Sequence, residues 1–220
     1  MKSCVMLFFA TVFFFLFLQA GDKQTPDKVL KRYNSVKMFS ADFSQIYTSR
    51  VTKTVKNRSG RITYRKPSSI RIDAEKEGEL IEQTFINEGN TVFVYHDKKS
   101  VLKKEHSRDI EAYLVFLKGV EPIKKQFEIK DSSSNISVAK KAGMKVPDGS
   151  LLIKLTPRKT IKNINYIFLV AENNEVTSII IVDNIHNINQ FMFKDISYNK
   201  PVKKELFVPK YPDDYEVSSF

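Results

Sequence analysis

The residues from Gly60 to Asp73 alternate between apolar and polar side chains with a period of two, the pattern of half-buried β-strands. One face of this segment carries Ile62, Tyr64, Lys66, Ile70 and Ile72. Lys66 is the exception, because a cation on an apolar face is costly unless a partner stabilises it or the face lines a cavity. The segment therefore predicts two strands that turn at Pro67-Ser68-Ser69 and form the wall of a binding cavity.

Further strand patterns occur along the chain, at residues 41–48, 80–87, 91–96, 126–130, 151–156, 165–170, 176–183 and 188–197. Helical spacing occurs at 25–36 and 107–119. Residues 50–59 and 131–150 are predicted as a polar link and a loop. Because strands and helices do not alternate regularly, we expect an α+β fold with one large antiparallel sheet. A sheet this long curls, which predicts a half-open, incomplete β-barrel with helices lidding an apolar cavity.

Five more residues are candidates for the wall and lid of this cavity. Val92 and Val94 lie in the strand predicted at 91–96, and Tyr113, Leu114 and Leu117 lie on the apolar stripe of the second helix. Together with the five residues of the first segment, they form the predicted ligand-binding set.

The first twenty residues predict export. Lys2 precedes an uncharged run from Val5 to Leu18, which is shorter than the roughly 20 apolar residues that span a membrane. We expect a signal peptide at 1–20, cleaved after Ala20, and a single periplasmic domain at 21–220; a retained anchor is the alternative. Cys4, the only cysteine, precedes the apolar run, so the chain is not expected to be a lipoprotein and its exported part has no disulfide.

Composition and motifs favour binding over catalysis. The net charge is +11, or +10 without Lys2. In an exported chain, this positive charge favours anionic membrane surfaces or acidic proteins over nucleic acid as partners. The alternative is that the charge reflects composition alone. The three histidines are scattered, and no nucleophile elbow, phosphate loop or metal motif occurs. We expect no enzyme activity, metal or cofactor, although sequence alone does not exclude a carboxylate pair.

Several motifs, in order, resemble the LolA family of periplasmic lipoprotein carriers. They are Phe43-Ser44-Gln45, Lys66-Pro67-Ser68-Ser69-Ile70-Arg71-Ile72, the hairpin Asn87 to Tyr95, Leu155-Thr156-Pro157-Arg158-Lys159, Phe193-Lys194-Asp195-Ile196 and Phe207-Val208-Pro209. The resemblance implies a LolA/LolB-like fold whose cavity takes the acyl chains of lipoproteins. It also implies transfer from an inner-membrane ABC transporter and, where one exists, to an outer-membrane receptor.

Lys66 falls where the family has an arginine that tethers the lid of the empty carrier. A lysine lacks the planar fork of arginine, so closure is expected to be weaker. We hypothesise that Lys66 donates to lid carbonyls near Leu114 to Gly119. The expected protein is a monomer, and a periplasmic lipid or lipoprotein sensor of the same fold is the alternative function.

Overall fold

A computed structural model describes residues 24–87, 90–105, 110–161 and 163–219. Within them the chain forms one twelve-stranded sheet in the order β12-β6-β5-β4-β3-β2-β1-β11-β10-β9-β8-β7. The strands are β1 (Met38–Thr48), β2 (Val55–Arg65), β3 (Ser69–Lys76), β4 (Glu79–Asn87), β5 (Asn90–Tyr95), β6 (Ser100–Glu105), β7 (Phe127–Asp131), β8 (Leu151–Pro157), β9 (Tyr166–Glu172), β10 (Glu175–Val182), β11 (Ile188–Tyr198) and β12 (Glu216–Ser219).

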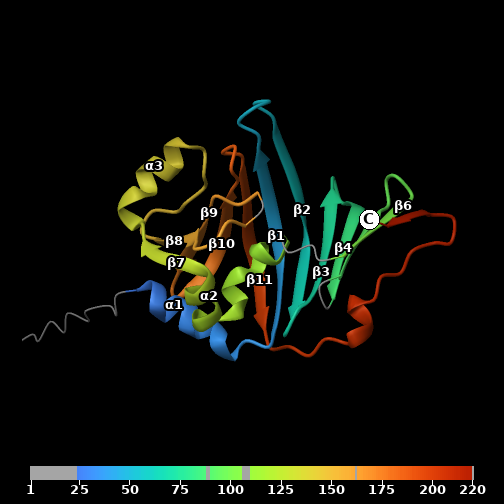
Figure 1. Ribbon diagram of the computed structural model, residues 1–220, viewed down its shortest axis with the longest axis horizontal. Coiled ribbons are helices and arrows are strands. Elements are labelled where there is room, and N and C mark those ends of the chain that lie inside the picture. Colours follow the sequence, from blue (N-terminus) through green and yellow to red (C-terminus); the bar gives the residue numbers. More distant parts are fainter. Residues whose placement is uncertain (1–23, 88–89, 106–109, 162, 220) are drawn as a thin grey trace, which may run out of the picture.

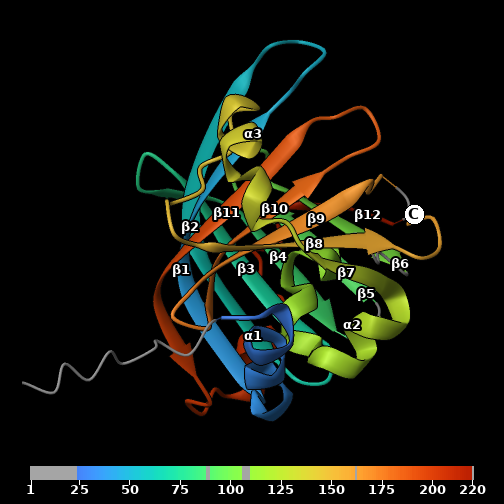
Figure 2. The same cartoon turned by 90° about the vertical axis from the view of Figure 1, so that its left-hand side faces the viewer.

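The helical elements are short. They are α1 (Pro26–Arg32), α2 (Val120–Gln126) and α3 (Ile136–Lys141), with 3₁₀ segments η1 (Tyr33–Ser35), η2 (Ile110–Lys118), η3 (Ser133–Asn135) and η4 (Lys204–Phe207). Figures 1 and 2 show α1, η2 and α2 against the concave side of the curled sheet, and α3 outside it.

All neighbouring strands pair antiparallel except β12, which runs parallel to β6. The pairing confirms the hairpin expected at Lys66 to Ile70, with Tyr64 opposite Ile70 and Ile62 opposite Ile72. Register shifts between Ser40 and Asp42, and in β3 and β10, add twist where the sheet bends. β7 and β12 stay at opposite edges, so the sheet is curled but not closed.

Gly60 lies at a close approach of β2 and β3. Its φ is +154°, and a side-chain methyl group here would overlap the carbonyl oxygen of Asp73. Only glycine fits this point without displacement of the neighbouring strand.

The sheet is apolar on its concave face and covered in two places on its outer face. The main core joins the concave face to α1, η2 and α2. A second cluster packs Ala139, Met144 and Val146, from α3 and the following loop, onto the outer face of β8–β11. A third lies outside β4–β6, where Tyr211 and Tyr215 cover Phe85. The C-terminal segment therefore covers the outer face at β4–β6, and α3 with its following loop covers it at β8–β11.

The predicted helix at 25–36 begins as expected. The Thr25 hydroxyl accepts a hydrogen bond from the backbone N–H of Lys28 at 3.4 Å, and Pro26 occupies the first turn. Val29 and Leu30 are buried against the sheet. The helix then continues as the tighter 3₁₀ segment η1. Together, α1, η1, η2 and α2 form the lid over the concave face of the sheet.

Two expectations about the remaining elements are wrong. Residues 55–59, predicted as a link, belong to β2, which forms a long hairpin with β1. The loop predicted at 131–150 contains η3 and α3, because Ala139 has an apolar surface to cover. The second helix ends at Lys118 as expected, although it is a 3₁₀ segment. The sequence did not predict α2, which follows at once and holds Pro122 in its first turn, where proline is tolerated.

Candidate functional site

The concave face of the sheet forms an apolar wall. Four predicted residues, Ile62, Tyr64, Ile70 and Ile72, lie on it and are buried in the main core. The phenylalanines Phe39, Phe43, Phe191 and Phe193 of β1 and β11 continue the same surface. This wall offers an apolar ligand no competing charge at its centre.

The lid inserts a plug of side chains into the space in front of this wall. Leu114, Val115, Phe116 and Leu117 of η2 are all buried, with Phe116 and Leu117 fully so. The Phe116 ring meets the rings of Tyr33, Phe39 and Phe193 at centroid distances of 4.9, 5.7 and 6.0 Å. Phe116 therefore joins the lid to the adjacent central strands β1 and β11. Sequence reasoning left it out of the site because it gave the helical stripe to Leu114 and Leu117.

Lys66 joins the wall to the lid, although not where it is expected to. Its Nζ donates to the carbonyl oxygens of Tyr33 at 3.3 Å and Asn34 at 3.2 Å. The hypothesis that it reaches carbonyls near Leu114 to Gly119 is wrong, because η1 lies between Lys66 and that segment. Partial burial lowers the pKa of the Lys66 ammonium from its usual value.

Asn34 carries this contact on to the second lid segment. Its Oδ1 accepts a hydrogen bond from the backbone N–H of Val120 at 3.0 Å, at the start of α2. Gly119, with φ of +85°, lies directly beside the Asn34 side chain. Asn34 thus connects Lys66 to both η1 and α2.

A pair of tyrosines fixes α1 to the sheet. The Tyr33 hydroxyl accepts from the backbone N–H of Val176 at 2.7 Å and lies 3.4 Å from the Tyr198 hydroxyl. Burial raises the pKa of both phenols, and their mutual contact raises that of Tyr198 further. Both stay protonated and act as hydrogen-bonding groups.

Two predicted wall residues face the other way. In the β4–β5 register, Phe93 is opposite Thr84 on the concave side, while Val92 is opposite Phe85 on the outer side. Val94 is buried in the outer cluster with Phe85, and Val92 packs against that cluster. Their placement in the cavity wall is therefore wrong. The side chain of Tyr113 lies outside the described part of the structure.

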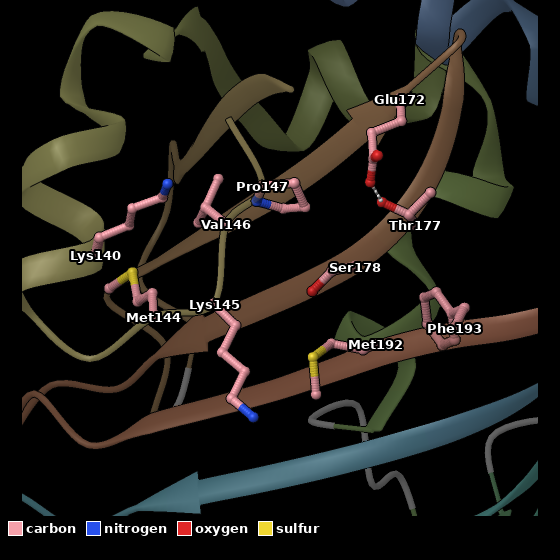
Figure 3. Close-up of a pocket in the computed structure, with 10 residues that line it drawn as sticks. All are labelled: Lys140, Met144, Lys145, Val146, Pro147, Glu172, Thr177, Ser178, Met192 and Phe193. Atoms are coloured by element: carbon pink, nitrogen blue, oxygen red, sulfur yellow. Dashed lines mark hydrogen bonds between the residues drawn. The ribbon is translucent and has the colours of Figure 1, made fainter. Parts of the chain in front are cut away.

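A separate hollow of about 510 Å³ lies on the outer face of the sheet, between the loop after α3 and strands β10 and β11 (Figure 3). Met144, Val146, Pro147 and Met192 supply its apolar lining, and Lys140 and Lys145 lie at its margin. The Glu172 carboxylate accepts from the Thr177 hydroxyl at 2.9 Å. This hollow is on the side of the sheet opposite the plug, so it is not part of the cavity predicted from the sequence.

The two histidines that the structure describes lie on different elements. His96 contacts Gln83 Oε1 at 3.0 Å and the Tyr215 hydroxyl at 3.1 Å, His186 occupies a turn, and His106 lies outside the described residues. Among the residues that the structure describes, no group of three His, Cys, Asp or Glu side chains is arranged to hold a metal ion.

The predicted signal peptide at 1–20 also lies outside the described residues. In the part of the chain that the structure describes, no helix is long and apolar enough to cross a bilayer.

The architecture is a curled, open sheet whose apolar interior is closed by short helices. The same fold occurs in an uncharacterized conserved protein from Thermus thermophilus, which is 11% identical over 87% of this chain and 95% of its own, with a TM-score of 0.51. A LolA superfamily protein from Nitrosomonas europaea is 7% identical over 83% of this chain and 94% of its own, with a TM-score of 0.47. No curated protein sequence is significantly similar to this chain.

The family model described as outer membrane lipoprotein carrier protein LolA matches residues 34–210. The chain belongs to the LolA family. The matched residues include the wall, the plug, Lys66 and Asn34, so the site described above lies within the family domain.

Proposed function

We propose that this protein is a periplasmic carrier that holds the acyl chains of lipoproteins behind its lid. In this role it receives lipoproteins from an inner-membrane ABC transporter and delivers them to the outer membrane, or to a receptor there. The observation that carries the proposal is the buried plug at Phe116, which fills an apolar interior that an acyl chain would also fill. Membership of the LolA family supports the same role.

The energetics of acyl transfer explain why such an interior is needed. Each methylene moved from lipid to water costs about 0.8 kcal/mol, so a chain of about 15 methylenes costs roughly 12 kcal/mol. A carrier offsets this cost with apolar surface of its own. In the closed form, the plug covers the same wall and prevents its exposure to water.

The contacts of Lys66 make the closed form competitive with the loaded one. Two charge-assisted hydrogen bonds hold η1 against the end of β2, and Asn34 holds α2 in turn. Entry of an acyl chain moves the lid and breaks these bonds, and their recovery favours release. The lysine thus acts on the balance between holding and releasing cargo.

The variant Lys66→Leu tests this role. Hydrogen bonds from a charged donor contribute about 1.5–3 kcal/mol, so we expect cargo to be released to acceptor membranes at least about tenfold more slowly. Lys76→Leu, at an exposed lysine at the end of β3, is the matched control and should transfer cargo normally. Unchanged transfer by Lys66→Leu would contradict the tether.

Depletion of the protein separates a carrier from a sensor. A carrier's loss leaves lipoproteins at the inner membrane, whereas a sensor's loss leaves their distribution intact. Mass spectrometry of protein purified from cells identifies any bound lipopeptide. The mass of the same protein also tests whether residues 1–20 are removed after Ala20.

A further inference from the structure

Three segments meet at the end of the molecule opposite α1 and α2. They are the β1–β2 turn with the first two residues of β2 (49–56), the β10–β11 turn (183–187) and α3 with its following loop (136–147), as Figures 1 and 2 show. Arg50 joins them: its backbone N–H donates to Asn187 Oδ1 at 2.8 Å, and its guanidinium donates to the carbonyl of Ala142 at 3.5 Å. These segments are called the basic end below.

The basic end displays aliphatic side chains to solvent. Val51, Val55, Val138 and Ile185 are 69, 60, 62 and 59% exposed, and they make up four of the seven strongly exposed large apolar residues in the described part of the chain. Single exposed aliphatics are ordinary, but their concentration on adjoining segments is not.

The turns that carry these side chains have defined shapes. The Ser49 N–H bonds to the Thr54 carbonyl at 2.9 Å, and the Ser49 hydroxyl accepts from the Thr52 N–H at 3.2 Å. The Asp183 carboxylate accepts from the backbone N–H groups of Ile185 and Asn187 at 3.0 and 2.8 Å. The Val51 and Ile185 side chains therefore project from fixed turns, while Val55 begins β2 and Val138 lies on α3.

The charge of the basic end is strongly positive. Its cations are Arg50, Lys53, Lys56, Lys140, Lys141 and Lys145, and its one carboxylate is Asp183. That carboxylate is occupied by the hydrogen bonds of its own turn. Outside these segments, Asp148 pairs with Lys140 at 2.6 Å, which leaves five cations without a carboxylate contact among the described residues.

We propose that the basic end docks on the surface of an anionic phospholipid membrane. Cations attract the headgroups, and aliphatic tips enter the boundary between headgroups and acyl chains. The tips project from separate segments, which a fluid bilayer accommodates, whereas an acidic protein would need a surface shaped to fit all of them. The inference concerns the end opposite the lid and holds whether or not the interior carries acyl cargo.

The absence of tryptophan from the chain provides a direct test. The full-length variants Val51→Trp and Ile185→Trp each carry a single reporter at the basic end. Val208→Trp is the matched control, because Val208 is 54% exposed and follows η4, away from this end. Each variant is mixed with vesicles of phosphatidylcholine alone or of phosphatidylcholine with added phosphatidylglycerol. Brominated lipids in the vesicles quench the fluorescence of a tryptophan that enters the bilayer.

We expect a blue shift and quenching at positions 51 and 185 with phosphatidylglycerol vesicles, little response with phosphatidylcholine, and none at position 208. This pattern also separates docking of the basic end from any anchoring by the N-terminal segment, which would not place these turns in lipid. No response at 51 and 185, or an equal response at 208, overturns the proposal.

The charges are tested in the Val51→Trp background. Each cation near an anionic surface contributes about fivefold to partitioning, so Lys56→Glu with Lys141→Glu should weaken it by at least roughly 25-fold. The matched control, Lys103→Glu with Lys210→Glu, reverses the charge of two exposed lysines elsewhere and should change partitioning much less. Equal losses in the two double variants would show that net charge, and not the basic end, is responsible, and would overturn the assignment.

Discussion

Replacement of Phe116 by alanine should lower the unfolding free energy of the empty protein and increase its affinity for an acyl ligand. The ring is fully buried among Tyr33, Phe39 and Phe193. Removal of a buried phenylalanine side chain costs about 3–5 kcal/mol of unfolding free energy. If an acyl chain takes the place of this ring, part of the lost unfolding free energy is recovered when the ligand binds, and the affinity for the ligand rises.

The expected gain follows from the three ring contacts. Each aromatic pair contributes about 0.5–1.5 kcal/mol beyond its buried area, which gives roughly 1.5–4.5 kcal/mol for the plug. Since about 1.4 kcal/mol corresponds to a tenfold change in Kd, Phe116→Ala should bind an acyl ligand about 10- to 1,000-fold more tightly. The ligand should therefore restore stability to this variant more than to the wild type.

Two measurements check this expectation. Urea unfolding followed by circular dichroism gives the stability of the protein with and without a diacylated lipopeptide, and a fluorescent form of that lipopeptide gives its Kd. Phe85→Ala is the matched control, because Phe85 is 3% exposed but belongs to the outer cluster. The control should lose stability with an unchanged Kd. An equal Kd for both variants would refute the idea that the plug occupies the cargo space.

Three further predictions concern the tether and the strands beside it. Because burial lowers the pKa of Lys66 below its usual 10.5, the folded chain loses this proton before the unfolded chain does. The unfolding free energy should therefore rise with pH between the two pKa values, and the difference between wild type and Lys66→Leu in urea unfolding should show it. Asn34→Ala removes the acceptor of the Val120 amide and should speed its hydrogen exchange about fivefold, for a loss of about 1 kcal/mol, whereas Asn34→Asp keeps an acceptor. Gly60→Ala should cost at least about 1–3 kcal/mol in urea unfolding, because its methyl group meets the Asp73 carbonyl at a strained φ; unchanged stability would show that β2 and β3 move apart easily.

The sequence predicted the sheet well where only one face of a strand is apolar. Ile62, Tyr64, Ile70 and Ile72 alternate with charged or hydroxyl side chains, so their burial on a single face could be read directly from the order of residues. The strand at 91–95 lacks that contrast, since Val92 and Val94 alternate with Phe93 and Tyr95. Which side faces the interior depends on Tyr211 and Tyr215, more than a hundred residues later, and local periodicity does not reveal this.

The partner of Lys66 illustrates a second limit. An isolated cation on an apolar face indicated that a partner was needed, and the structure supplies one. That partner consists of backbone carbonyl groups at Tyr33 and Asn34. Since every residue has a carbonyl group, acceptors of this kind leave no signature in the sequence. Their position follows only from the packing of η1 against the end of β2.

The open sheet leaves two free strand edges, and their composition bears on self-association. Unpaired edges invite pairing with another copy of the same chain. At one edge, β7 exposes Glu128, Lys130 and Asp131, and at the other, β12 is only four residues long with every side chain exposed. The charged side chains of β7 and the short length of β12 both oppose edge-to-edge pairing into larger sheets. The sheet can therefore stay open at both borders without offering a long apolar edge to a second copy.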